Sequence, residues 1–181
     1  MKKLLLLAAL TLPLFASAQP SPYASEQSRS IKSLSESDIA GYLAGRGMGL
    51  ARAAELNRYP GPRHVLDLAA ELNLTAAQVA QLKTFFATME AAAKSAGEQL
   101  VARERELDQL FARQEATAPR VLALTAEIGR LQGLVRAAHL NAHVATTAIL
   151  TPDQVTRYAA TRGYDSAGQS PAAHDPSRHQ G

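Results

Sequence analysis

The sequence predicts an all-α protein whose centre is a long antiparallel helical hairpin flanked by short helices. Alanine and leucine dominate the composition, aromatic residues make up only 5% of it, and tryptophan and cysteine are absent. This composition is typical of long helices rather than of sheets. Between residues 74 and 154, two long segments carry apolar residues at alternating spacings of three and four, and the pattern Leu-Thr-x-x-Gln stands at both ends of this region. Such a sustained spacing predicts coiled-coil-like helix packing.

Each copy of the pattern predicts a helix start. The motif residues are Leu74, Thr75 and Gln78 in the first copy and Leu150, Thr151 and Gln154 in the second. The threonine can accept a hydrogen bond from a backbone N–H of the first turn, and the glutamine can reach back to the N–H of the cap. Pro152 supports the second start, because a proline at the first helical position loses no hydrogen bond.

The hairpin is predicted to consist of one helix over 76–115, about 60 Å long, and a return helix over 119–149. A last short helix is expected over 152–161. Arg103 is the one charged residue in the apolar register of the first long helix. Several large apolar residues lie outside the register and need another surface, either the flanking helices or a second subunit: Phe85, Phe111, Leu122, Leu134 and Leu140.

A second helical stretch is predicted on the N-terminal side of the hairpin. The residues from Ser35 to Asp38 form another capping-box pattern, and we expect a helical stretch from there through Leu56. Four glycines within it weaken a helix by up to ~1 kcal/mol each relative to alanine, so either close backbone packing or a hinge is expected. The Pro-Gly-Pro sequence at 60–62 ends the stretch, and a short helix is expected over 63–72.

The N-terminus has the features of a secretory signal. Lys2 and Lys3 precede an apolar run over 4–15, and Ala-Ser-Ala follows at 16–18. The run is shorter than the ~20 residues that a membrane span needs. We therefore expect export to the periplasm, with no membrane span after cleavage.

Four regions follow from these patterns. They are a signal peptide over 1–18, a flexible polar arm over 19–34, an all-helical domain over 35–164 and a disordered tail over 165–181.

Charge and cysteine content exclude two classes of function. The formal net charge is +3, and the loss of Lys2 and Lys3 would leave 17 basic residues against 16 acidic ones, a charge of +1. A nearly neutral chain lacks the basic surplus of a nucleic-acid-binding protein, so the pI near 9.4 does not indicate one. Without cysteine, the chain has neither disulfides nor thiol chemistry.

The sequence also lacks a catalytic pattern. It contains no Ser/His/Asp arrangement in a strand–turn–helix context, no glycine-rich phosphate loop after a strand and no His-Glu-x-x-His. We therefore predict that the protein is not an enzyme and has no catalytic or cofactor-binding residues.

Two Leu-Thr-x-x-Gln copies flanking a long helical hairpin, behind a signal peptide and without cysteine, resemble the Spy/CpxP family of periplasmic proteins. The same group includes the metal-responsive ZraP and CnrX proteins, and the resemblance covers residues 43–164. It implies a curved, intertwined antiparallel homodimer in which the six motif residues are structural. It also implies an ATP-independent chaperone of the envelope stress response, which binds unfolded or misfolded client proteins and, in some relatives, restrains an envelope sensor kinase.

The alternative hypothesis is a periplasmic heavy-metal-binding sensor or resistance protein. His139 and His143 share one face of a helix and could bind zinc or another divalent transition metal. A third ligand would have to come from His64, Glu71 or a second subunit. The chain lacks the Met/His-rich run of some relatives, and the other interpretation of the pair is two ordinary surface histidines.

Two groups of arginines are candidates for client binding. The charged run over 103–113 is either a solvated helix face or a client surface made by Arg103, Arg105, Leu110 and Phe111. A second basic series has only Glu55 to offset it; its members are Arg46, Arg52, Arg58 and Arg63. Arginine combines an apolar stem with a charge, which suits loose contact with many partners.

Overall fold

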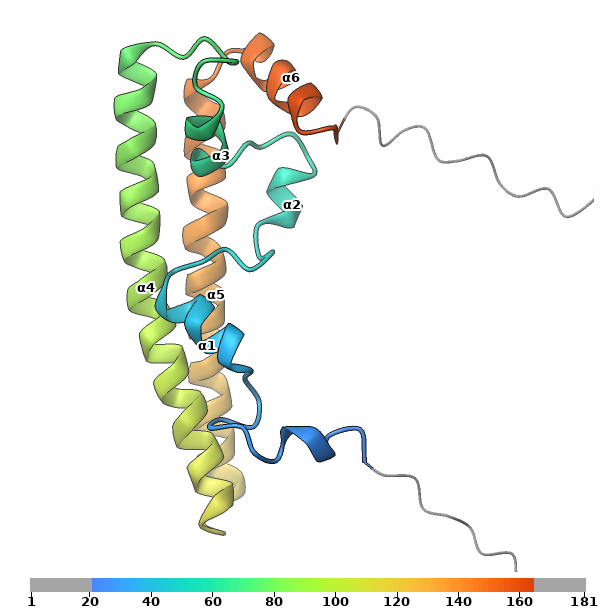
Figure 1. The fold of residues 1–181 in the computed structure, drawn as a ribbon. Coiled ribbons are helices and arrows are strands. Elements are labelled where there is room, and N and C mark those ends of the chain that lie inside the picture. The colour runs from blue at the N-terminus through green and yellow to red at the C-terminus, as the bar shows by residue number, and fades with distance from the viewer. Residues whose placement is uncertain (1–20, 165–181) are drawn as a thin grey trace, which may run out of the picture.

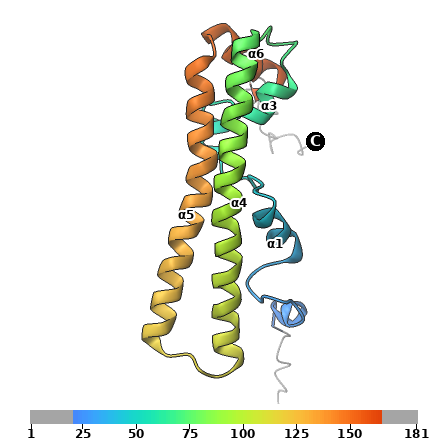
Figure 2. The same cartoon turned by 90° about the vertical axis from the view of Figure 1, so that its left-hand side faces the viewer.

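The centre of the protein is an antiparallel pair of long helices, α4 (Ala76–Ala112) and α5 (Ala118–Ile149) (Figure 1). The computed structural model describes residues 21–164. The two helices run side by side along the length of α5, about 48 Å (Figure 2). The predicted fold class is therefore confirmed. The predicted signal peptide, the first residues of the predicted arm and the predicted tail lie outside the described residues.

Short helices lie along one side of this hairpin (Figure 1). Helix α1 packs on α4, α3 contacts both long helices, and α2 contacts α5. The short elements are η1 (Ala24–Glu26), α1 (Glu36–Leu43), α2 (Arg52–Glu55), α3 (Pro62–Asp67) and α6 (Pro152–Thr161). None of the helices in the described part of the chain is both long enough and apolar enough to span a membrane.

The helical stretch predicted from Ser35 through Leu56 is interrupted, which corrects that prediction. Helix α1 ends at Leu43, and Gly45 and Gly49 have φ angles of +63° and +78°. Met48 between them also has a positive φ, 45°. A right-handed helix cannot continue through such residues. The glycines therefore end the helix, and the segment from 44 to 51 crosses to α2 as a series of turns.

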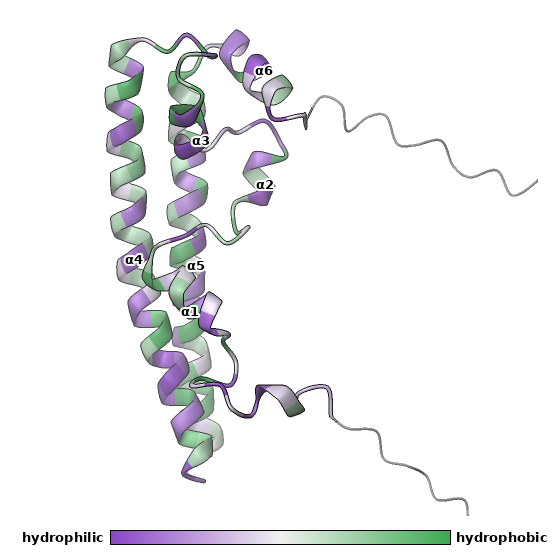
Figure 3. Cartoon of the chain, viewed as in Figure 1, coloured by the Kyte–Doolittle hydropathy of each residue, from purple (hydrophilic) through white to green (hydrophobic). Residues whose placement is uncertain are grey.

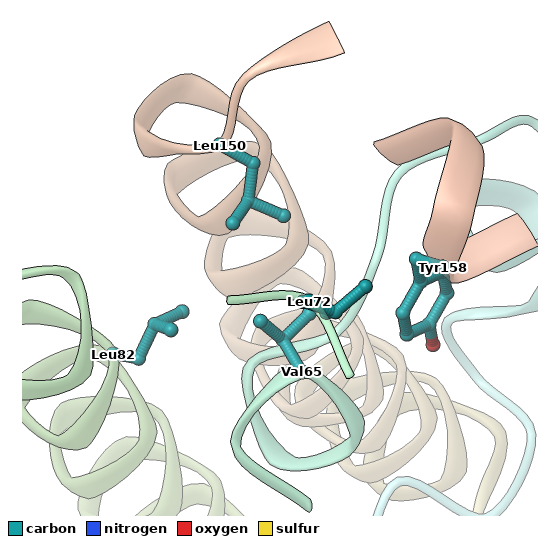
Figure 4. Close-up of a cluster of buried hydrophobic side chains, with 5 residues drawn as sticks. All are labelled: Val65, Leu72, Leu82, Leu150 and Tyr158. Carbon is teal, nitrogen blue, oxygen red and sulfur yellow. The ribbon is translucent and has the colours of Figure 1, made fainter. Parts of the chain in front are cut away.

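One core cluster closes the end of the hairpin where α4 begins and α5 ends. Its buried members are Val65, Leu72, Leu82, Leu150 and Tyr158 (Figure 4). They come from α3, the turn after it, α4, the end of α5 and α6, so this cluster joins four helices. Leu74 packs against the same cluster, so the leucines of both motif copies are part of it.

A second cluster reaches into the segment predicted as a flexible arm. Ile31 and Leu34 are buried with Ile39 against Val101 of α4. The hydroxyl of Ser33 donates to the carboxylate of Glu104 at 2.8 Å. Packing thus extends further toward the N-terminus than the composition indicated, because two apolar residues in a serine-rich stretch are enough to hold it on α4.

The register of α4 also differs from the prediction near Glu104. Arg103, expected in the apolar register, is exposed and pairs with Glu106, whereas Glu104 is buried. The third cluster, Leu100, Ile128 and Leu131, joins the two long helices at this level. Ser33 supplies the hydrogen bond that the buried Glu104 carboxylate requires, which the local pattern of α4 could not indicate.

Hydrophobic residues recur along the whole length of both long helices (Figure 3). Most of those on the facing sides are buried, but Phe111 on α4 and Leu122, Leu134 and Val144 on α5 are exposed. The hairpin therefore leaves apolar surface uncovered in a single chain.

Candidate functional site

Both copies of the Leu-Thr-x-x-Gln pattern form complete capping boxes. In the first, the backbone N–H of Gln78 donates to Thr75 Oγ1 at 3.2 Å, and that of Thr75 donates to Gln78 Oε1 at 3.0 Å. In the second, the same two bonds join Thr151 and Gln154 at 3.2 and 2.9 Å. Each box satisfies backbone donors that a helix start leaves free.

The two boxes are also bonded to each other through their glutamines. Gln78 Nε2 donates to Gln154 Oε1 at 2.8 Å, and Gln154 Nε2 lies 3.2 Å from Gln78 Oε1. The same amides donate to the carbonyls of Ile149 and Leu72 at 2.9 and 3.3 Å. The motif is thus a structural junction that fastens the start of α4 to the start of α6.

A pocket of about 450 Å³ lies between the hairpin and the glycine-rich segment. Its walls come from residues 44–52, Glu55, the start of α3 at 61–64, α4, α5 and Arg162 after α6. The side chains from the long helices are Phe86, Met89, Glu90, His139 and His143.

Positive charge predominates around this pocket. Four arginines line it, namely Arg46, Arg52, Arg63 and Arg162, against two carboxylates, Glu55 and Glu90. Glu90 is paired with Lys94 at 3.4 Å. Within residues 21–164, no carboxylate pairs with Arg46 or Arg52. The pocket therefore favours a ligand that carries negative charge.

Glu55 connects three helices at the edge of the pocket. The hydroxyls of Tyr158 and Tyr164 donate to its Oε1 at 2.5 and 2.8 Å. Arg162 Nε lies 3.8 Å from the same oxygen, and His143 Nδ1 lies 3.6 Å from Oε2. Burial, followed by the hydrogen bond to Glu55, raises the pKa of Tyr158 above its ordinary value. The same two causes raise the pKa of Tyr164. Both tyrosines therefore remain protonated donors, and α2 is held against α5 and α6.

The two histidines of α5 are not surface residues, which corrects that alternative of the sequence analysis. His139 and His143 are 5% and 8% exposed. The Nδ1 of His143 donates to the carbonyl oxygen of Tyr59 at 2.6 Å, because a carbonyl can only accept. A Cβ added at Gly61 would lie 2.9 Å from Cε1 and Nε2 of the His143 ring, so this ring is packed against the backbone.

The donors present do not form a metal centre by themselves. Among residues 21–164, no group of three His, Cys, Asp or Glu side chains is arranged to hold a metal ion. His143 uses Nδ1 for Tyr59, and Glu71 is exposed outside the pocket. His139 Nε2 and Glu55 Oε2 are buried without a hydrogen-bond partner. Two buried atoms without partners therefore support the zinc hypothesis, but the described residues do not supply a complete set of ligands.

Acidification is expected to destabilise the protein through His139. Burial first, and then neighbouring His143, lower the pKa of His139 below its ordinary value of 6.5, while the Arg46 backbone opposes the shift. The unfolded chain then binds a proton at this histidine more readily than the folded protein does. The contribution of neutral His139 to the free energy of unfolding is therefore fully present above about pH 6.5 and is lost as the pH falls through the folded-state pKa. Urea unfolding between about pH 7.5 and pH 5.5 should show a falling midpoint.

His139→Gln should reduce that fall, whereas His64→Gln, at an exposed position, should leave it unchanged. An equal pH dependence in the wild type and the His139 variant would contradict this assignment.

The residues predicted to bind clients do not form one exposed surface. Leu110 is 3% exposed and belongs to the core, which removes it from any client contact, while its neighbour Phe111 is exposed. Arg103 is paired with Glu106, and Arg105 is exposed. Client binding by Arg103, Arg105 and Phe111 near the hairpin turn stays a prediction.

Most of the pocket was not predicted from the sequence. The roles of Met48, Phe86 and Met89 in its wall, and of Glu55 as a junction, were not predicted. One signal was present for Glu55, since it is the only acid within a basic series. The two tyrosines after α5 gave no comparable signal, because their partner lies about a hundred residues earlier in the chain.

The comparisons with known proteins give one match. The sequence model of a family described as "LTXXQ motif family protein" matches residues 62–162, more than half of the chain. No curated protein and no solved structure matches it. The matched residues run from α3 to the end of α6 and include both glutamine-linked boxes.

Proposed function

The chain belongs to the LTXXQ motif family, the Spy/CpxP/ZraP group, and on this premise we propose that it is an ATP-independent chaperone. Proteins of this family are non-enzymatic stress proteins and are typically periplasmic. In this proposal the chain is exported by its N-terminal signal and loses residues 1–18. It then binds unfolded or misfolded proteins of the envelope and suppresses their aggregation.

One observation carries the proposal, the surface of residues 43–63. Large apolar side chains are exposed there beside exposed arginines; the apolar residues are Leu43, Met48, Leu56 and Tyr59, and the arginines are Arg46, Arg52, Arg58 and Arg63. Exposed apolar groups on a folded framework are the usual mark of a binding surface. Reversible capture of apolar segments lowers the free concentration of aggregating chains and needs no chemical energy.

A homodimer is part of the proposal. Leu122, Leu134 and Val144 are exposed along α5, and a second copy would cover apolar area that a lone hairpin leaves in water. An envelope sensor kinase is a further proposed partner, on family resemblance alone.

The proposal is tested by light scattering of an unrelated protein that unfolds and aggregates. The exported chain, residues 19–181, is added without ATP, and an inert folded protein of similar size serves as the control. Slower aggregation with the chain alone is the expected result. Sedimentation equilibrium on the same sample is expected to give the mass of a dimer.

The aggregation assay is repeated once with added zinc and once with a chelator. These conditions are included because His139 Nε2 and Glu55 Oε2 are buried without partners and could bind a metal ion. Suppression that occurs only with zinc would favour a metal-assembled chaperone. A folded chain that leaves aggregation unchanged in every arm would refute the chaperone role, and tight zinc binding in that case would favour the metal-sensor alternative.

A further inference from the structure

The pocket beside the glycine-rich segment has an apolar wall of adaptable side chains. Met48 and Met89, the only two methionines in residues 21–164, both line it together with Phe86. Methionine is flexible and polarisable, and surfaces that bind many different apolar side chains use it for that reason. This wall suits a variable apolar side chain better than one rigid small molecule.

Met48 is held in a costly backbone conformation. Its φ is 45°, a value that glycine adopts readily and a methionine rarely does. It nevertheless stands between Gly47 and Gly49 and is 39% exposed. Retained backbone strain of this kind is characteristic of functional sites. Here it places a large apolar side chain at the pocket, against Gly41, where an added Cβ would lie 3.1 Å from Met48 Cγ.

The charges around this apolar wall are complementary to a carboxylate. Arg46 and Arg52 line the pocket, and no carboxylate pairs with either within the described residues. Arg63 lies over the Phe86 ring at 5.8 Å and is paired with Asp67. The two acids of the lining already have partners, Lys94 for Glu90 and two tyrosines for Glu55. Arg46 and Arg52 can therefore pair with the carboxylates of a bound segment, because the acids of the pocket are already paired with other residues.

We propose that this pocket is a docking site for a client segment in which one large apolar side chain is flanked by acidic residues. The apolar side chain contacts Met48, Phe86 and Met89, and the flanking carboxylates pair with Arg46 and Arg52. The inference rests on the proposed chaperone function and specifies the class of segment that is bound.

The direct test is fluorescence anisotropy with short labelled Gly-Ser peptides and the exported chain. The first peptide has one phenylalanine between two aspartates, the second replaces the aspartates by lysines, and the third replaces the phenylalanine by alanine. The first is expected to bind at least about tenfold more tightly than either of the others. Its affinity should fall with added salt, since exposed ion pairs are screened.

Variants locate the binding. Arg46→Glu with Arg52→Glu should weaken the binding of the aspartate peptide at least about tenfold. The same variant should bring the affinity for the lysine peptide closer to that for the aspartate peptide. Lys83→Glu with Arg136→Glu changes the net charge equally at exposed positions outside the pocket and should leave both affinities unchanged. Circular dichroism checks that each variant is folded. The milder Arg46→Gln with Arg52→Gln should have an affinity for the aspartate peptide between those of the wild type and the glutamate variant.

A photo-crosslinking phenylalanine analogue in the first peptide gives an independent readout. Cross-links to Met48 or Met89 would support the proposal, and cross-links confined to the hairpin turn would overturn it. Equal binding of the three peptides would also overturn it. If the chain suppresses aggregation while the glutamate variant binds and suppresses like the wild type, this pocket assignment fails and the chaperone function stands. If the chain suppresses nothing, the chaperone function fails, whatever the peptides show.

Discussion

Replacing Gln154 by leucine is expected to lower the free energy of unfolding by about 2–4 kcal/mol. Gln154 is 6% exposed and joins two helix starts through Thr151, Gln78 and the carbonyl of Leu72. Leucine keeps most of the volume but cannot make these bonds. The Thr151 N–H loses its side-chain acceptor, and the Leu72 carbonyl loses its side-chain donor in a buried place. Gln78 loses its bonds to Gln154 but keeps those to Thr75 and Ile149. Urea unfolding followed by circular dichroism measures the change.

The control for this prediction is Gln81→Leu, at an exposed position of α4 close to the same junction. It is expected to change stability by no more than ~0.5 kcal/mol. The double variant Gln78→Leu with Gln154→Leu should cost less than the sum of the single changes, because each amide is the other's partner. Strict additivity would show that the two glutamines do not act as a pair.

Replacing Gly97 by alanine is expected to destabilise the protein by about 1–3 kcal/mol. In an isolated helix the same change would stabilise by up to ~1 kcal/mol, since alanine is the better helix former. Gly97 lies within α4 under the last turn of α1, and an added Cβ would lie 2.8 Å from the carbonyl carbon of Tyr42 and closer still to its oxygen. Helix α1 must therefore move off α4, which also loosens the cluster of Ile39 and Val101.

Gly129→Ala is the matched control, because nothing lies within 4 Å of an added Cβ at that position of α5. It is expected to stabilise by about 0.5–1 kcal/mol. Opposite signs for the two glycine-to-alanine changes, measured by thermal and urea unfolding, are the decisive result. A stabilising Gly97→Ala would mean that α1 does not rest on α4 at this residue.

Features that depend on neighbouring residues in the chain were predictable. The helix starts at 76 and 152 agree with α4 and α6, because a threonine cap and a glutamine three residues later define a helix start within one turn. The return helix was expected from 119 and begins at Ala118. The local pattern did not show whether the glycines continue or end a helix. The stretch predicted through Leu56 proved to be two helices.

The candidate site was much less predictable, since its residues come from five separate parts of the chain. The spacing of His139 and His143 places them on one face of α5, as predicted, but local spacing could not determine what covers that face. The covering segment includes Tyr59 and Gly61, about eighty residues away in the chain. His139 lies against Gly47, about ninety residues away in the chain, and the expected loss of stability in acid depends on the burial of His139 there.

By itself the sequence determined an all-helical hairpin, its caps and its family, because periodicity and capping act over one or two helical turns. Only the tertiary structure decided that Gln78 and Gln154 bond to each other, that Leu110 is core while Phe111 is exposed, and that two methionines and two unpaired arginines share one pocket. These outcomes depend on which side of a helix meets a partner from elsewhere in the chain. Spacing within one segment carries no information about the identity of that partner.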